Sequence, residues 1–164
     1  MTRKTTSLGK NLATEKLSQL DLKAPVFVGP KTDIFTVLEQ MRTAKSGCAL
    51  IQEGTALKGI FTERDVLTRV VKAKTPLETP ICDVMTADPK TLAIESTVGT
   101  AIRLMIKGGY RNLPLTTRNK QGETEVIRVL SVRDLVKYFG SNFPSEVYNL
   151  PPDPHQVQTA REGA

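Results

Sequence analysis

An internal duplication is the feature that most constrains the fold of this chain. In the first part of each half, apolar residues and a proline recur in the same order at a spacing of 64 positions (for example 105 minus 41). The matched pairs are Pro25 and Pro89, Ile34 and Val98, Leu38 and Ile102, and Met41 and Met105. Later, residues 59–65 (GIFTERD) match residues 128–134 (RVLSVRD) at a spacing of 69 (134 minus 65), so the second half has a longer loop. Such self-similarity indicates two copies of one supersecondary unit.

Each half predicts the same order of secondary-structure elements. An extended segment precedes a stretch whose apolar residues recur at helical spacing, and a hairpin then leads into a second amphipathic helix. These elements are expected at 26–28, 34–41, 48–51, 57–61 and from Thr62 in the first half, and at 91–94, 98–105, 113–115, 125–130 and from Ser131 in the second. We therefore expect a mixed α/β (α+β) fold of two β-α-β-β-α repeats.

The repeats are expected to occupy most of the chain. We place them at residues 21–75 and 76–140, after a leader segment at 1–20. The tail at 141–164 is rich in proline, which cannot sustain a helix interior, and we expect no regular fold there.

Two connecting segments carry expectations of their own. The leader contains three leucines that we expect to pack on the first half, Leu12, Leu17 and Leu20. Residues 79–85 (TPICDVM) favour a short linker helix between the halves, with Thr79 as its N-cap and Pro80 in its first turn.

The composition disfavours an enzyme or a membrane protein. Hydrophobic residues make up 39% and charged residues 24% of the chain, which is typical of globular proteins. No apolar stretch approaches the roughly 18 residues of a membrane-spanning helix, and no signal peptide is evident, so we expect a cytoplasmic location. The only histidine, His155, lies in the tail, and Cys48 and Cys82 lack the spacing of metal ligands. We therefore expect no catalytic residue, metal or cofactor.

The net charge of +6 is compatible with binding to nucleic acid or to phosphorylated small molecules. The basic residues are spread along the chain, and no basic stripe is interleaved with aromatic residues as in single-stranded nucleic-acid binders. Nucleic-acid binding is therefore the less favoured of the two.

A short polar motif follows the last strand of each repeat, Thr62-x-x-Asp65 in the first and Ser131-x-x-Asp134 in the second. A helix N-terminus exposes unpaired N–H groups that favour phosphate, and the hydroxyls of Thr62 and Ser131 can each add one hydrogen bond to it. The aspartates can accept hydrogen bonds from the ribose hydroxyls. The structural alternative is a capping box, in which both side chains bond only to their own helix. On its own the motif favours the capping box; its recurrence at equivalent places of a duplicated unit, together with a resemblance to a known family, favours a ligand site.

The order of elements together with this motif, over about residues 20–140, resembles the CBS domain family. The resemblance implies that the two units pack as a pseudo-twofold pair, with clefts between the sheets that bind AMP, ADP, ATP, S-adenosylmethionine or a related ligand such as NAD. It also implies a homodimer. Because many such pairs are appended to an enzyme, channel or transporter, a separate, unidentified effector protein is the expected partner here.

The two copies differ at the expected ligand contacts. Residues 109–114 (GYRNLP) resemble the family's entry to its second strand, where an arginine reaches toward phosphate, which assigns that role to Arg111. The first copy has no cation there, so its site is expected to be weaker or empty. Arg64 and Arg133 precede the motif aspartates and can pair with phosphate or with neighbours such as Glu63. Four apolar residues at strand ends are candidates to sandwich the base, namely Val26, Ala49, Leu113 and Pro114.

The sequence leaves two main hypotheses. The first is a regulatory module that senses an adenine nucleotide, since cations near the clefts favour an anionic ligand over the cationic S-adenosylmethionine. The alternative is a protein-interaction scaffold with vestigial clefts.

Overall fold

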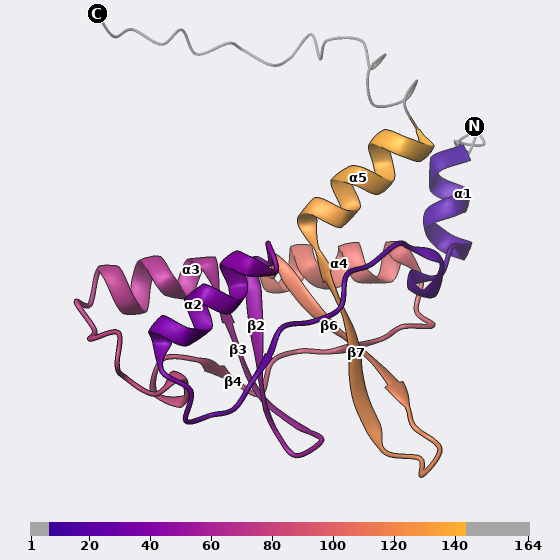
Figure 1. The fold of residues 1–164 in the computed structure, drawn as a ribbon. Helices are drawn as coiled ribbons and strands as arrows, with labels where there is room; N and C mark the ends of the chain where they lie inside the picture. Colours follow the sequence, from indigo (N-terminus) through magenta and orange to yellow (C-terminus); the bar gives the residue numbers. More distant parts are fainter. Residues whose placement is uncertain (1–6, 144–164) are drawn as a thin grey trace, which may run out of the picture.

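The computed structural model describes residues 7–143 and shows a mixed α/β fold with two small sheets (Figure 1). In chain order the helices and strands are α1 (Ser7–Thr14), β1 (Phe27–Val28), α2 (Ile34–Thr43), β2 (Cys48–Glu53), β3 (Ala56–Thr62), α3 (Glu63–Asp65), β4 (Thr86–Ala87), β5 (Leu92–Ala93), α4 (Val98–Gly108), β6 (Asn112–Arg118), β7 (Thr124–Ser131) and α5 (Val132–Asn142). The predicted fold class and the order strand, helix, hairpin, helix are confirmed in both halves.

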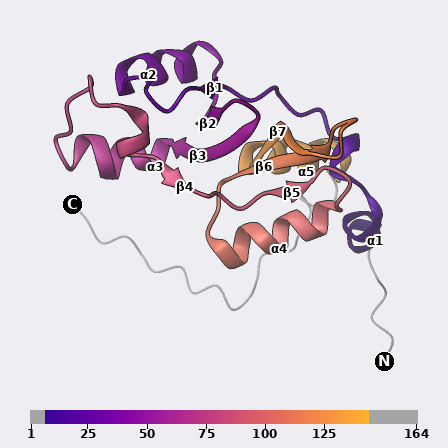
Figure 2. The same cartoon turned by 90° about the horizontal axis from the view of Figure 1, so that it is seen from below.

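The two sheets repeat the same topology. The first has the strand order β1-β2-β3-β4 and the second β5-β6-β7, and each begins with a parallel pair followed by an antiparallel hairpin. The hairpins also share an irregularity, because the register shifts between Ile51 and Gln52 in one and between Leu115 and Thr116 in the other, 64 positions apart. Figure 2 shows the two repeats side by side.

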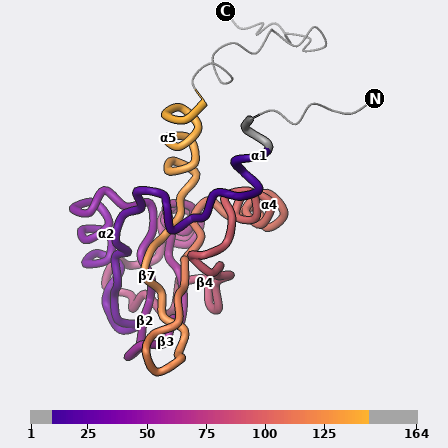
Figure 3. The backbone as a smooth tube through the Cα atoms, turned by 90° about the vertical axis from the view of Figure 1, so that its right-hand side faces the viewer, coloured from indigo at the N-terminus to yellow at the C-terminus, as the bar shows by residue number. Residues whose placement is uncertain are grey.

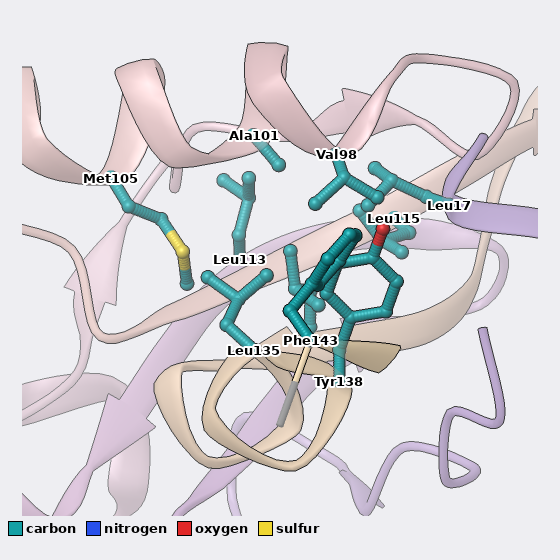
Figure 4. Close-up of a cluster of buried hydrophobic side chains, with 10 residues drawn as sticks. Leu17, Val98, Ala101, Met105, Leu113, Leu115, Leu135, Tyr138 and Phe143 are labelled. Atoms are coloured by element: carbon teal, nitrogen blue, oxygen red, sulfur yellow. The ribbon is translucent and has the colours of Figure 1, made fainter. Parts of the chain in front are cut away.

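Each sheet packs against the helices of its own repeat. The first core contains Val28, Ile34, Val37, Met41, Ala49, Ile51, Phe61 and Val70, among others. The second contains Val98, Ala101, Met105, Leu113, Leu115, Leu130, Leu135, Tyr138 and Phe143 (Figure 4). A third cluster joins the sheets, and its buried residues are Cys48, Leu50 and Ile60. Successive side chains on a strand point to opposite faces, so β2 serves two of these cores at once.

The leader packs against the second repeat, which corrects the expectation that it completes the first. Leu17 is fully buried in the second core, and its amide donates to the Ser96 carbonyl over 2.9 Å. Leu12 and Leu20 pack on the same core. A Cβ built on Gly99 would lie 2.7 Å from the Leu12 carbonyl oxygen, so the glycine allows α1 to approach α4 closely. Figure 3 shows α1 beside α4 and α5.

The segment between the halves packs on the first repeat, whereas the leader packs on the second. Ile81 and Val84 are buried in the first core, and the strand that follows them, β4, pairs with β3. The expected linker helix is instead a single 3-10 turn at Ile81–Asp83. Pro80 rather than Thr79 precedes that turn, and the Thr79 carbonyl accepts from the Ile34 amide. A two-residue strand such as β4 is too short to show periodicity, so the sequence did not predict it.

The final helices of the two repeats differ. In the first repeat, α3 continues as a π-helix over Val66–Val71, whereas α5 is a regular α-helix that extends to Asn142. The helix therefore ends slightly beyond the predicted boundary at residue 140. The expectation for the rest of the proline-rich tail concerns residues 144–164, which lie outside the described part of the chain.

Candidate functional site

A cavity of about 880 Å³ lies between the repeats and brings the two copies of the polar motif together. Its lining includes Thr62 and Asp65 from the first repeat and Ser131 and Asp134 from the second. Both pairs lie where the last strand of a repeat passes into its helix, so the helix N-termini of α3 and α5 begin at the cavity. The duplicated motif thus converges on one continuous space rather than on two separate clefts.

Both motifs form capping boxes within their own helices. In the second repeat the Ser131 hydroxyl donates to Asp134 Oδ2 over 2.6 Å, and the Ser131 amide donates to the same oxygen over 2.7 Å. The Thr62 hydroxyl and amide make the equivalent bonds to Asp65 Oδ2, of 2.7 and 2.9 Å. The structural interpretation of the motif is therefore correct for this state. In each motif the cap engages only Oδ2 of the aspartate, and Oδ1 takes no part in it.

Basic side chains dominate the lining of the cavity. Three of them have acidic neighbours, since Arg69 lies beside Asp65, Arg133 beside Glu63 and Lys137 beside Asp21. Within residues 7–143 no carboxylate pairs with the other basic lining residues, which are Lys23, Lys45, Arg64, Lys90 and Arg111. The acidic lining residues are Glu63, Asp65 and Asp134. This excess of positive charge favours an anionic occupant.

The two motif arginines link the repeats across the cavity. Arg64 Nη2 lies 3.4 Å from the carbonyl oxygen of Gly109, and Arg133 Nη2 lies 3.9 Å from Glu63 Oε1. Both contacts are long and both side chains of the ion pair are exposed, so they contribute little to stability. The arginines are therefore free to exchange these partners for a ligand at small cost.

The backbone confirms that Arg111 and Gly47 occupy equivalent positions. The Val132 amide donates to the Arg111 carbonyl over 3.0 Å, and the Glu63 amide donates to the Gly47 carbonyl over 3.1 Å. Each carbonyl thus accepts from the first residue of the following helix. The sequence alignment that gave the second repeat a cation and the first repeat none is therefore correct in three dimensions.

The four apolar residues expected to sandwich a base do not line the cavity. Ala49, Leu113 and Pro114 are fully buried, and Val26 is half-buried against the first core. Ala49 and Leu113 face the helices of their repeats because side chains alternate along a strand. The apolar part of the lining instead includes Pro25, Cys48, Ile60, Tyr110 and Val129. Ile60 and Val129 each stand two positions before a motif hydroxyl, and this spacing on a strand could have identified them.

Gly59 and Tyr110 have structural roles. A Cβ built on Gly59 would lie 2.3 Å from Met85 Sδ, so the glycine makes room for the segment that leads into β4. The second sheet has no fourth strand among the described residues, which explains why Arg128 is tolerated at the equivalent place. The half-buried Tyr110 ring lies over Gly108, where a Cβ would come within 2.0 Å of it.

No metal site accompanies the cavity in the described part of the chain. Residues 7–143 contain no cluster of three histidine, cysteine or acidic side chains that could hold an ion. Cys48, on the cavity wall, is buried, and burial raises the pKa of its thiol to about 12, so it stays protonated and unreactive at neutral pH. None of the described helices is long and apolar enough to span a bilayer.

Comparison with known proteins relates both repeats to one family. A family model described as the CBS domain matches residues 17–72 and 81–141. The CBS domain-containing protein CBSCBSPB1 of Arabidopsis thaliana is 33% identical over 106 residues, which are 64% of this chain and 19% of that protein. This chain thus spans about a fifth of the length of that relative.

Solved structures share the architecture. A conserved protein from Pyrococcus horikoshii, 17% identical, superposes with a TM-score of 0.68 over 77% of this chain and 92% of its own. A CBS domain protein from Pyrobaculum aerophilum, solved in complex with AMP, is 26% identical and gives a TM-score of 0.64 over 73% of this chain and 89% of its own. Because the family model matches both copies of the duplicated unit, this chain belongs to the CBS domain family and carries a tandem pair of CBS domains.

Proposed function

We propose that this chain is a regulatory module whose cavity binds an adenine nucleotide, AMP, ADP or ATP. The observation that carries the proposal is the convergence of both polar motifs and a surplus of basic side chains on one cavity of about 880 Å³. That volume is within the range of small-molecule sites. CBS domains are typically regulatory rather than catalytic, and the related protein from Pyrobaculum aerophilum was solved with AMP bound.

Each part of a nucleotide has a chemically suitable partner in the cavity. The Arg111 guanidinium supplies a charge-assisted donor for phosphate, next to the N-terminus of α5. Asp134 Oδ1 can accept a hydrogen bond from a ribose hydroxyl while Oδ2 keeps the helix capped. Ile60 and Val129 offer apolar surface to the base. An anionic ligand gains from the basic lining, which disfavours the cationic S-adenosylmethionine.

Regulation requires that the ligand bind two states of the protein unequally. The contacts that cross between the repeats at the cavity, from Arg133 to Glu63 and from Arg64 to Gly109, are the ones that a phosphate would replace. Ligand binding would therefore change how the two repeats are held together. We propose that a separate effector protein responds to this change.

A second copy of the chain is the other proposed partner. Leu67 and Val136 occupy equivalent positions in the two repeats (136 minus 67 is 69), and their exposed fractions are 65% and 66%. Val71 and Val132 extend the exposed apolar surface on the same two helices. Apolar side chains exposed at matching places on both repeats support a homodimer through these helix faces.

A thermal-shift experiment tests the nucleotide proposal. A ligand that binds only the folded state raises the melting temperature, so AMP, ADP or ATP at millimolar concentration should raise it, and S-adenosylmethionine and NAD should raise it less. Arg111→Ala should reduce the shift. The matched control is Arg103→Ala, which removes an exposed arginine of α4 outside the cavity and should leave the shift unchanged. No shift from any adenine nucleotide would contradict the proposal and favour the scaffold hypothesis.

A further inference from the structure

The two halves of the cavity differ in the state of their aspartates. Asp65 is only 8% exposed, and its Oδ1 lies 3.3 Å from Arg69 Nε, while Oδ2 is held by the cap. Both oxygens of Asp65 are therefore occupied. Asp134 is half-buried, and no hydrogen bond or ion pair reaches its Oδ1 from any residue between 7 and 143. Only the second aspartate has an oxygen to offer a ribose.

Arg69 is held in place by more than Asp65. Its Nη1 donates to the Val84 carbonyl over 2.9 Å and also bonds the Met85 carbonyl. These carbonyls belong to the segment between the repeats, which packs on the first core. Three acceptors therefore fix the guanidinium beside Asp65, and a ribose hydroxyl would have to displace a charged, well-anchored donor.

The position equivalent to Arg69 in the second repeat holds a side chain that makes its contacts away from the motif. It is occupied by Tyr138 (138 minus 69 is 69), which is buried in the second core and donates its hydroxyl to the Glu15 carboxylate. Glu15 belongs to the leader, which packs on the second repeat. The leader thus supplies the acceptor for the Tyr138 hydroxyl. Because position 138 holds no cation, the residue equivalent to Arg69 does not pair with Asp134.

The residues that a phosphate would contact also differ between the two half-sites, and they again favour the second repeat. At the head of α5, Arg111 supplies a cation, and the first helical residue is the neutral Val132. At the head of α3, Gly47 supplies no side chain, and the first helical residue is Glu63. A Cβ built on Gly47 would lie 3.5 Å from the Glu63 carboxylate, so an anion at this place would meet a like charge.

We propose that the chain binds one nucleotide, with its ribose and phosphate in the half-site formed by Arg111, Ser131 and Asp134, and that Arg69 and Glu63 close the other half-site. This inference rests on the proposed function and adds the stoichiometry and the residues that determine it. The ribose and phosphate therefore contact the second repeat directly. The first repeat responds through the arginine contacts that cross the cavity.

Calorimetric titration with AMP of the wild type and two isosteric variants tests this inference. Asp65→Asn and Asp134→Asn remove the same charge from equivalent cap positions, so each controls for the cost to the other's helix, which melting curves without ligand will measure. We expect one equivalent of AMP per chain in the wild type. Asp134→Asn should weaken binding about 10- to 100-fold, because it removes a hydrogen bond to a charged acceptor. Asp65→Asn should change it less than about threefold.

The contrary outcomes separate this inference from the function on which it rests. Two equivalents per wild-type chain, or equal losses in the two variants, would overturn the single half-site and leave nucleotide binding intact. A folded wild type that binds none of AMP, ADP and ATP would overturn both.

A gain-of-function variant tests the determinants directly. The triple change Gly47→Arg, Glu63→Val and Arg69→Gln gives the first half-site a cation, removes its like charge and uncovers Asp65. The space at Gly47 permits a side chain, because the nearest atoms to a built Cβ are at an ordinary contact distance of 3.5 Å. We expect the folded variant to bind a second equivalent of AMP. Retention of one equivalent would show that other residues close the first half-site.

Discussion

Single glycines mark the places where elements approach too closely for a side chain. Gly59 lies against Met85 and the backbone oxygen of Thr86, at 2.3 and 3.1 Å from a built Cβ. Met85 belongs to the segment that covers the edge of β3. The identity of this residue is therefore explained by the packing of the segment before β4 against β3, and no contact with a ligand is needed to account for it.

Gly59→Ala should destabilise the protein by about 1–3 kcal/mol, as overpacking does in a filled core. Urea denaturation will measure the change in the free energy of unfolding. Gly140→Ala is the matched control, because a Cβ there meets nothing within 4 Å and the residue lies inside α5. That change should be neutral or stabilising by about 0.4–1 kcal/mol. Equal effects at both glycines would contradict the assigned contact.

Cys48 should make the stability depend on pH in the alkaline range. Burial raises the pKa of its thiol to about 12, whereas the unfolded chain releases the proton near pH 8.5. The stabilisation is therefore complete below about pH 8.5 and is lost as the pH rises toward 12, with a slope that approaches about 1.4 kcal/mol per pH unit. Denaturation between pH 8 and 10 should show a shallower decline in Cys48→Ala. The same slope in both proteins would refute the prediction.

The motif residues were predicted from the sequence, whereas the apolar wall of the cavity was assigned to the wrong residues. Thr62 and Ser131 were placed correctly at helix N-termini, because the capping pattern is local and recurs in both repeats. Which face of a strand borders the cavity depends on how the two sheets meet, and hairpin irregularities change that face. For this reason the expectation that Ala49 and Leu113 line the cavity is wrong, and both side chains lie in the cores.

At the scale of elements, periodicity predicted the helices and strands of the repeats except β4, but not which core buries the connecting segments. The leader and the linker each offer apolar residues that fit either of two similar cores. In the structure the leader packs on the second core through Leu17, and the linker packs on the first core through Ile81. This choice depends on close approaches such as that of Leu12 to Gly99, which no local pattern contains.

Leu17→Ala should cost about 2–5 kcal/mol, because the side chain is fully buried among second-repeat residues. Hydrogen exchange should then increase in α4 and α5 before it increases in α2. Ile106→Ala, at a position in α4 with 77% exposure, should change the free energy of unfolding by less than about 0.5 kcal/mol. Faster exchange in α2 than in α4 would instead support the original assignment of the leader to the first repeat.

At the scale of the whole molecule, a duplicated unit forms one asymmetric cavity. The sequence predicted the pair of repeats and the cation at Arg111. It did not reveal that Arg69 is anchored beside Asp65, since two of its acceptors are backbone carbonyls of a distant segment. Asymmetry of this kind arises from packing between segments, and it determines which half of a nearly symmetric site is open.

The homodimer proposal makes a separate prediction at this scale. Introducing charge with Leu67→Glu and Val136→Glu should shift the mass in solution toward the monomer, because both exposed side chains lie at the proposed contact. Light scattering coupled to size exclusion will measure the mass. Ile106→Glu, on α4, is the matched control and should leave it unchanged. A wild type that is monomeric at high micromolar concentration would contradict the proposal.

The location of nucleotide binding is the most direct test of the whole account. In a titration of isotopically labelled protein with AMP, we expect the largest saturable shifts at the backbone amides of Arg111, Asn112 and Arg133, beside Asp134. Amides at the tip of the hairpin, such as Gly122, should not move. Saturable shifts confined to residues away from the cavity, or none at millimolar AMP, ADP and ATP, would contradict the claim that this CBS pair holds a nucleotide between its two repeats.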